Sequence, residues 1–284
     1  MARYKEIKEK IHHSYKDLPK NHKRIADYFV DNFDRIPFLT VQDVSKSTSV
    51  SVASIVRFAQ RTGFNGFSEL RDAIAESLQN QIHNKEIFPL FETQKAKDDI
   101  LTSVANTDIK NINETLSEID REQFANAINL ISNSNRVFTA GLGISYLLAE
   151  ILAYQLTQVG IDASVFRHTH SLFNEQIIYM KKNDILFTFS FPPYSKETVD
   201  AAKFASNRGL QVISITNRIA SPITFFSKIS LIVKSENMLF TNSFAAISVM
   251  INAIATACAM KNKRRASSVL EETEKIMISQ KHTL

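Results

Sequence analysis

The chain has 284 residues, of which 44% are hydrophobic, and its 34 basic and 29 acidic side chains leave a formal net charge of +5. This length accommodates two domains with separate cores, and the ordinary apolar content excludes disordered and fibrous proteins. Cys258 is the only cysteine, which excludes an intrachain disulfide and a cysteine-based metal site, and we expect it to be a buried apolar side chain.

Residues 1–24 carry a surplus of positive charge. Such a patch suits the neutralisation of DNA phosphates, with a solvated helix face as the alternative. No hydrophobic core of a signal peptide opens the chain, so we expect a cytoplasmic protein that does not bind a membrane. The charged side chains of this segment are Arg3, Lys5, Lys8, Lys10, Lys16, Lys20, Lys23 and Arg24 against Glu6, Glu9 and Asp17.

Apolar side chains recur at helical spacing over residues 4–15 and 25–33, which predicts two amphipathic helices. We expect the second to end at Pro37, because proline disrupts a helix interior.

A helix-turn-helix is predicted over residues 39–67. Its first helix covers 41–47, and a short turn leads to a second helix over 52–62. Ser51 stands at the N-cap of this second helix and Gly63 at its C-terminal stop.

The second helix has two unlike faces. Val52, Ile55, Val56 and Ala59 form an apolar stripe at helical spacing, which we expect to be buried. The opposite face holds small, amide and basic side chains without an acid, as in helices that read base edges in the major groove. A helix pair with a solvated outer face is the alternative. The predicted DNA-binding residues are Ser51, Ala53, Ser54, Arg57, Gln60 and Arg61.

From residue 136 onwards, strand-like and helix-like runs alternate. The strands are expected at 136–140, 161–166, 184–190, 210–216 and 229–233, and the helices at 145–159 and 196–207. This alternation predicts a parallel sheet covered on both faces. The apolar run 244–260 is short for a membrane span of about 20 residues, so we interpret it as a buried or interface helix, and the basic run 261–265 as a helix terminus.

The expected fold class is therefore α/β with an all-α N-terminal domain. We expect a helix-turn-helix DNA-binding domain over 1–78, a linker over 79–106 that is partly helical, and a doubly wound parallel-sheet domain over 107–284.

Ligands of open α/β sheets bind beyond the carboxyl ends of the strands, near helix N-termini that favour anions. Three turns qualify, and for each the alternative is a tight turn or an N-cap without a ligand. The candidates are Gly141, Gly143 and Ser145 in the first turn, Ser190, Ser195 and Thr198 in the second, and Thr216, Asn217 and Arg218 in the third.

The segments 49–71, 140–150 and 184–217 resemble the RpiR family of bacterial transcription regulators, in which a helix-turn-helix precedes a SIS (sugar isomerase) domain. This resemblance implies a homodimer or dimer of dimers that represses carbohydrate-metabolism genes. Its binding to an operator in double-stranded DNA would be modulated by a sugar phosphate in the SIS domain. We expect no cofactor, no metal and no catalytic activity.

SIS domains commonly carry a Ser-x-Ser-Gly-x-Thr loop that holds the sugar phosphate. Ser190 and Ser195 match the ends of this loop, whereas Pro192 and Pro193 replace its second serine and its glycine. Proline has no N–H, so the loop loses two backbone donors and one hydroxyl.

Two alternative functions remain. A phosphosugar isomerase would need a general base, for which Glu236 is the first candidate and His168 and His170 come next. Glu236 is also included in the expected ligand site. The other alternative is a DNA binder whose sensor domain is vestigial. A helix-turn-helix has no role in an isomerase, which favours the regulator.

Overall fold

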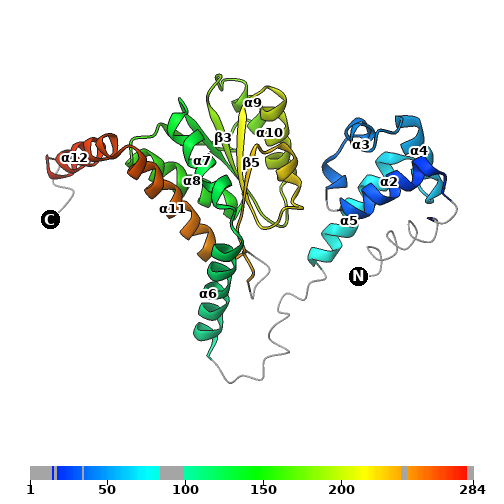
Figure 1. Cartoon of the computed structure of the whole chain (residues 1–284), viewed down its shortest axis with the longest axis horizontal. Helices are drawn as coiled ribbons and strands as arrows, with labels where there is room; N and C mark the ends of the chain where they lie inside the picture. Colours follow the sequence, from blue (N-terminus) through cyan, green and yellow to red (C-terminus); the bar gives the residue numbers. More distant parts are fainter. Residues whose placement is uncertain (1–14, 16–17, 34, 84–98, 238–241, 280–284) are drawn as a thin grey trace. The chain divides into compact units, whose positions relative to one another are not determined.

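The computed structural model describes residues 15, 18–33, 35–83, 99–237 and 242–279 (Figure 1). The predicted helix over 4–15 and most of the N-terminal basic run lie outside these residues. The chain divides into an N-terminal helical unit and a C-terminal α/β unit, with the boundary after Lys95. That boundary lies inside the segment expected as a linker.

The N-terminal unit is built from helices around an aromatic core. Phe29 and Phe58 are fully buried with ring centroids 5.5 Å apart, and Ile25, Leu70 and Ile74 are buried as well. The elements are α2 (Lys20–Asp31), the 3₁₀ helix η2 (Ile36–Phe38), α3 (Val41–Thr48), α4 (Val52–Arg61) and α5 (Phe67–His83). The predicted helix-turn-helix is present as α3 and α4.

Helix α2 ends at Asp31, so the prediction that it ends at Pro37 is wrong. Asn32 caps the helix, because its backbone N–H and its side-chain amide both donate to the carbonyl of Tyr28, at 3.0 and 2.9 Å. Pro37 instead lies in η2, where a residue without an N–H is tolerated in the first turn.

The C-terminal unit contains a five-stranded, entirely parallel sheet in the order β2-β1-β3-β4-β5. The strands are β1 (Val137–Ala140), β2 (Ala163–Val165), β3 (Ile185–Ser190), β4 (Gln211–Thr216) and β5 (Ile229–Ile232). All six residues of β3 are buried, as expected for the central strand of a parallel sheet. The doubly wound parallel sheet is thereby confirmed.

Helices cover both faces of the sheet (Figure 1). Helices α7, α8 and α11 lie on one side, and α9 and α10 lie on the other. The helices of this unit are α6 (Ile100–Glu118), α7 (Arg121–Asn133), α8 (Ile144–Gln158), α9 (Phe173–Ile177), α10 (Lys196–Asn207), α11 (Ala245–Lys261) and α12 (Lys263–Ser279), with a 3₁₀ turn η3 (Pro222–Phe226).

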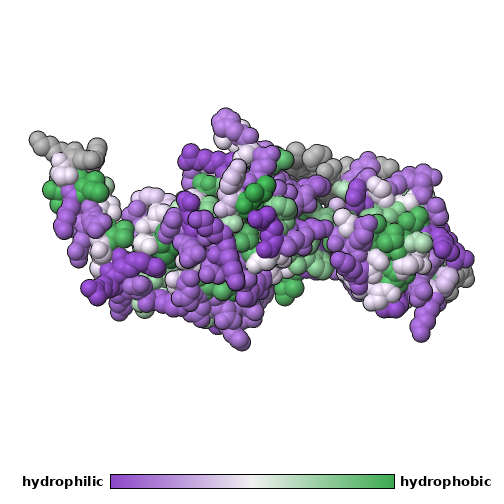
Figure 2. Space-filling view, turned by 90° about the horizontal axis from the view of Figure 1, so that it is seen from above, coloured by the Kyte–Doolittle hydropathy of each residue, from purple (hydrophilic) through white to green (hydrophobic). Residues whose placement is uncertain are grey.

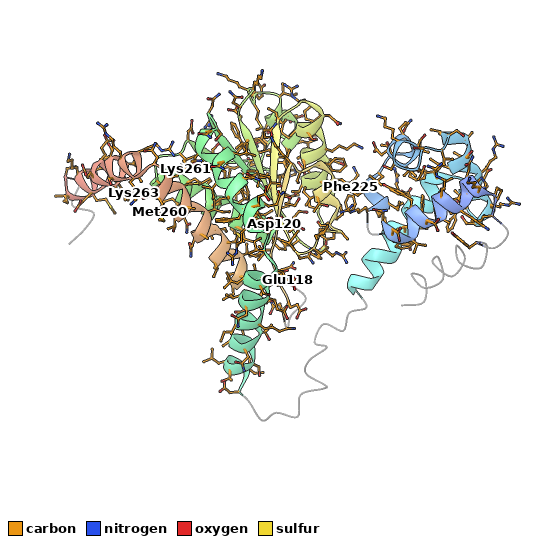
Figure 3. The ribbon with its side chains drawn as sticks, in the orientation of Figure 1. Glu118, Asp120, Phe225, Met260, Lys261 and Lys263 are labelled. Carbon is orange, nitrogen blue, oxygen red and sulfur yellow. The ribbon has the colours of Figure 1, made fainter. Side chains whose placement is uncertain are left out.

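Helix α6 begins inside the segment expected as a linker and is capped by Asp99, whose carboxylate accepts the Thr102 N–H at 2.8 Å. The side chains of Glu118 and Asp120 mark its junction with α7 in Figure 3.

The apolar run at 244–260 forms α11, whose inner face belongs to the core of this unit and includes Cys258. Cys258 is fully buried, as predicted, and burial raises the pKa of its thiol. Among the described residues, no single helix is long and apolar enough to cross a membrane. Helices α11 and α12 pass that test only as a pair, and they are bent by 107°.

Candidate functional site

The turn between α3 and α4 sets the position of α4. Ser49 adopts the left-handed conformation at the end of α3 (φ 52°). The Ser45 hydroxyl donates to the Val50 carbonyl at 2.7 Å. Ser51 caps α4 as predicted, because its hydroxyl accepts the Ser54 N–H at 3.3 Å. Of the residues predicted for the exposed face of α4, only Ser51 contributes its side chain to the bond that caps the helix.

The buried face of α4 differs from the predicted stripe. Ile55, Phe58 and Ala59 are fully buried and Thr62 follows on the same face, whereas Val52 is 38% exposed. Val56 is half-buried. The predicted stripe that included Val52 is therefore partly wrong. Phe58 turns inward because its ring fills the space against Phe29, and burying an aromatic ring removes more apolar surface from water than burying a valine.

The outward face of α4 keeps the predicted residues together. Ala53, Arg57, Gln60 and Arg61 are exposed on it, as is Ser51 at its start, while Ser54 is half-buried. Neither arginine forms an ion pair with another residue that the structure describes. The face therefore presents two guanidinium groups and an amide to solvent on a rigid helix.

The pKa of His22 in α2 is affected by the positive charges of this face. Its ring meets the Phe58 ring edge-on at 6.1 Å. Burial lowers the pKa of His22, and the nearby charges of Arg61 and Arg57 lower it further. The same field would attract the phosphates of a nucleic acid.

In the C-terminal unit, the turn after β1 approaches its following helix closely. A Cβ on Gly141 would lie 2.6 Å from the carbonyl oxygen of Ser145, and Gly143 has a φ of +61°. Only glycine satisfies both conditions without strain. Ser145 is buried at the start of α8, so this turn brings backbone close to the carboxyl end of β1.

Two buried hydroxyl groups flank the turn between β3 and α10. Ser190 ends β3 and is 2% exposed, and Thr198 lies in the first turn of α10 and is 1% exposed. Neither hydroxyl oxygen has a hydrogen-bond partner among the described residues. Ser195 caps α10, because its hydroxyl accepts the Thr198 N–H at 3.3 Å. Since buried polar groups are normally bonded, these two hydroxyls are available for a ligand.

The structure joins the second and third candidate turns. The Tyr194 hydroxyl donates to the Asn217 side chain at 2.7 Å and accepts from the Arg218 guanidinium at 3.1 Å. The Thr216 hydroxyl donates to the Ser190 carbonyl at 2.7 Å, which links the ends of β4 and β3.

Pro192 and Pro193 lie between these polar groups and are linked by a cis peptide bond. The Pro192 carbonyl accepts the Asn242 amide at 2.5 Å. The turn is therefore held by side chains of two other loops.

Glu236, His168 and His170 are not brought together as one acid–base group. The Glu236 carboxylate is exposed and pairs with Lys110 at 2.9 Å, while its backbone is held by Asn111. His170 is exposed. Among the described residues, no group of three potential metal ligands is found.

His168 lies 2.6 Å from Glu197, measured from Nε2 to a carboxylate oxygen, and the other oxygen of Glu197 accepts the Phe173 N–H at 3.0 Å. Neither this pair nor the roles of Tyr194 and Asn242 were predicted from the sequence. Glu197 lies two residues after Ser195 in the sequence, and this proximity to a candidate ligand residue was the only indication that it could belong to the site.

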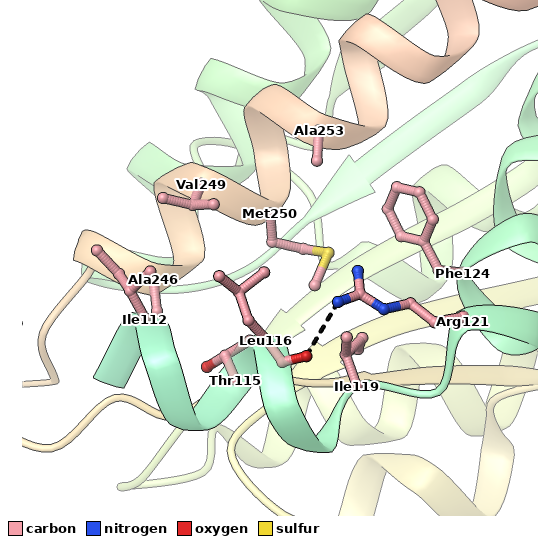
Figure 4. Close-up of a pocket in the computed structure, with 10 residues that line it drawn as sticks. All are labelled: Ile112, Thr115, Leu116, Ile119, Arg121, Phe124, Ala246, Val249, Met250 and Ala253. Carbon is pink, nitrogen blue, oxygen red and sulfur yellow. Dashed lines mark hydrogen bonds between the residues drawn. The ribbon is translucent and has the colours of Figure 1, made fainter. Parts of the chain in front are cut away.

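A separate groove with an apolar lining lies between α6, α7 and α11 (Figure 4). Leu116, Phe124 and Met250 contribute to its wall, and the Arg121 guanidinium is bonded to the Leu116 carbonyl at 3.0 Å. An apolar lining of this kind offers few partners to the polar groups of a sugar phosphate.

Comparisons with known proteins agree with both units. The family model for a helix-turn-helix domain of the rpiR family matches residues 5–81, and the model for the SIS domain matches residues 130–257. An uncharacterised HTH-type transcriptional regulator of Haemophilus influenzae is 27% identical over 233 residues, which cover 80% of this chain and 79% of the relative.

Two solved structures are similar in fold. The NanR protein of Vibrio vulnificus, complexed with ManNAc-6P, has a TM-score of 0.63 at 23% identity and covers 96% of this chain and 98% of its own. The sugar isomerase domain of an RpiR transcription factor from Sphaerobacter thermophilus has a TM-score of 0.61 at 24% identity. It covers 63% of this chain and 99% of its own.

Proposed function

This chain belongs to the rpiR family of helix-turn-helix proteins, with a SIS domain after the helix-turn-helix, and we propose that it represses genes of carbohydrate metabolism. It would bind operator DNA through α4 and sense a sugar phosphate in its C-terminal unit. The observation that carries the proposal is the exposed, acid-free face of α4, whose opposite face is fully buried. A DNA-binding regulator of this kind would act in the cytoplasm.

The reading of DNA would depend on the residues predicted for that face: Ser51, Ala53, Ser54, Arg57, Gln60 and Arg61. Arginine makes bidentate bonds to guanine and glutamine to adenine, and small residues let the helix backbone approach the groove. A homodimer would present two such helices about 34 Å apart, one turn of DNA, to a palindromic operator.

The sugar phosphate would bind at the carboxyl ends of β1 and β3. The orphan hydroxyls of Ser190 and Thr198 would bond to it, and the turn at Gly141, Gly143 and Ser145 would lie against it. Ser195 and Glu236 were also predicted there, but their side chains already cap α10 and pair with Lys110. We therefore assign the main role to Ser190 and Thr198. That NanR of similar fold is complexed with ManNAc-6P supports this ligand class.

The alternative is a phosphosugar isomerase, for which the His168–Glu197 pair would supply the acid–base group. The helix-turn-helix unit and the regulator names of the relatives favour a protein without catalysis.

The decisive experiment is a fluorescence anisotropy titration of DNA from upstream of the protein's own gene. Hexose and hexosamine phosphates are added, with the unphosphorylated sugars as matched controls. We expect binding that falls steeply with salt, and one phosphate should weaken it by roughly 5–150-fold. Equal affinity for unrelated DNA would contradict an operator-specific regulator.

Two further outcomes separate the alternatives. Specific DNA binding that no sugar phosphate alters would favour the vestigial sensor. Conversion of any sugar phosphate into its isomer, followed by NMR on the same samples, would favour the enzyme.

A further inference from the structure

The loop that follows β5 is closed at its base by hydrogen bonds between its two ends. The Ser243 N–H donates to the Ser235 carbonyl at 3.1 Å, and the Ser235 hydroxyl donates to the side-chain carbonyl of Asn242 at 3.1 Å. Ser235 and Ser243 are both buried. These bonds join the two ends into one bonded unit, which we call the loop base (residues 234–236 and 242–243).

The loop base is bonded to the turn of the proposed ligand site. The side-chain amide of Asn242 donates to the Pro192 carbonyl at 2.5 Å. Pro192 lies in the chain between Ser190 and Thr198, whose buried hydroxyls are the proposed contacts of the sugar phosphate. Proline has lost its N–H but keeps its carbonyl as an acceptor. A displacement of this turn therefore either moves Asn242 or breaks its bond.

Asn111 of α6 holds the backbone of the loop base by two hydrogen bonds. Its amide donates to the Glu236 carbonyl at 2.7 Å, and its side-chain carbonyl accepts the Glu236 N–H at 3.1 Å. The face of the molecule in Figure 2 is mostly hydrophilic, since polar side chains there meet water. Asn111 is polar but fully buried, so it depends on its partners within the chain. These two bonds therefore fix α6 to the loop base.

Further contacts join the same face of α6 to the loop base. The Ser243 hydroxyl donates to the Asp108 carboxylate at 2.5 Å, and the Thr115 hydroxyl accepts the Lys234 N–H at 2.9 Å. Glu118, labelled in Figure 3, pairs with the Lys234 ammonium group at 2.8 Å. Asp108, Thr115 and Glu118 are seven and three residues apart, which places them on one face of a helix. One face of α6 is thus bonded to the loop base along three turns.

In the chain, α6 is the first described helix after the N-terminal unit. Its beginning extends away from the sheet (Figure 1), and Ile100 and Leu101 are exposed. Its later turns pack on α11 and are bonded to the loop base. Because the first turn is exposed, the direction in which α6 leaves the sheet is set by these later contacts.

We propose that Asn242 transmits the binding of a ligand from the turn at Pro192 to α6, through the loop base and the contacts of Asn111 and Thr115. The inference rests on the proposed function and names the residues that regulate it. Asn242 is a positioning residue: it changes DNA binding only because the ligand favours one of two arrangements of α6 that differ in their affinity for DNA.

Three variants of the full chain test this connection. N242D removes the donor to Pro192, while its carboxylate still accepts the Ser235 hydroxyl. T115V removes the acceptor at the α6 end and keeps the shape of the side chain. The matched control is N135D, because the Asn135 amide also donates to a backbone carbonyl, that of Lys182 at 3.4 Å, but at the opposite edge of the sheet.

The first measurement is hydrogen exchange of the protein alone. In N242D, peptides from α6 and from the turn at 190–195 should exchange about tenfold faster than in the wild type, since one hydrogen bond between them is lost. Peptides from α4 should not change, and N135D should leave α6 unchanged. Unaltered exchange of α6 in N242D, or an equal acceleration in N135D, would refute the connection.

The second measurement is the anisotropy titration with hexose and hexosamine phosphates. A compound that shifts the DNA affinity of the wild type by roughly 5–150-fold should shift that of N242D and T115V by less than about twofold. Calorimetry should show that the variants still bind the compound. An undiminished shift in N242D would overturn the role of Asn242, and so would a loss of the compound's own affinity, which would make Asn242 a ligand contact.

The two measurements separate this inference from the proposed function. If no sugar phosphate shifts the DNA binding of the wild type, the sensing function fails. The hydrogen exchange of N242D against N135D then still decides whether Asn242 connects the turn to α6.

Discussion

The orientation of α4 can be tested by exchanging two of its apolar side chains for alanine. Phe58 is fully buried against Phe29, while Val52 is 38% exposed. Removing a buried phenyl ring costs about 3–5 kcal/mol, and removing an exposed aliphatic group costs within about 0.5 kcal/mol. Phe58→Ala should therefore destabilise the N-terminal unit by roughly 3 kcal/mol or more relative to Val52→Ala.

Hydrogen exchange in the full-length chain measures this difference unit by unit. Because about 1.4 kcal/mol corresponds to a factor of ten, peptides from α4 in the Phe58→Ala variant should exchange roughly a hundredfold faster or more. Peptides from β3 report on the C-terminal unit and should not change. Equal acceleration by Val52→Ala and Phe58→Ala would refute the orientation described here and restore the stripe that starts at Val52.

Three other predictions concern the two proposed sites. Arg57→Ala should weaken operator binding, measured by anisotropy, by about 1–3 kcal/mol. Arg71→Ala on α5, where the arginine is paired with Asp72, should leave the affinity unchanged, and an equal loss in both variants would show that Arg57 acts only through its nonspecific charge. Ser190→Ala should abolish the effect of a sugar phosphate on DNA binding without lowering the melting temperature, since the hydroxyl has no partner among the described residues. A retained effect would place the ligand elsewhere. His22 has a pKa below its unfolded value, so the unfolded chain binds the proton more readily and the N-terminal unit should lose stability as the pH falls below about 6.5. Urea titrations of His22→Gln should show a flatter pH dependence, and an unchanged slope would show that His22 does not contribute.

The sequence predicted the sheet better than the helices that surround it. Strand β3 is a continuous apolar run and α10 begins at Ser195 and is followed by Gly209, so both elements were placed within one residue of their observed ends. Fully buried strands and capped helices have strong local signals.

The predictions were wrong where tertiary packing determines which side chains are buried or paired. The buried face of α4 differs from the predicted stripe because Phe58, which that stripe left out, has a larger apolar surface to bury than Val52. Helix α12 was not predicted: the basic run 261–265 was interpreted as a helix terminus, whereas a new helix begins at Lys263 after a bend and continues to Ser279. The pairing of His168 with Glu197 joins a loop after β2 to α10, and no sequence pattern relates residues that far apart.

The two unbonded hydroxyls in the C-terminal unit also offer a way to find its ligand. Ser190 and Thr198 are buried and have no partner among the residues that the structure describes, so a compound that bonds to them offsets the cost of burying two unbonded hydroxyls. Binding to the folded state at a hundred times its dissociation constant adds about 2.7 kcal/mol of stability. A melting-temperature screen of sugar phosphates against the protein alone would therefore identify the compound before its operator is known.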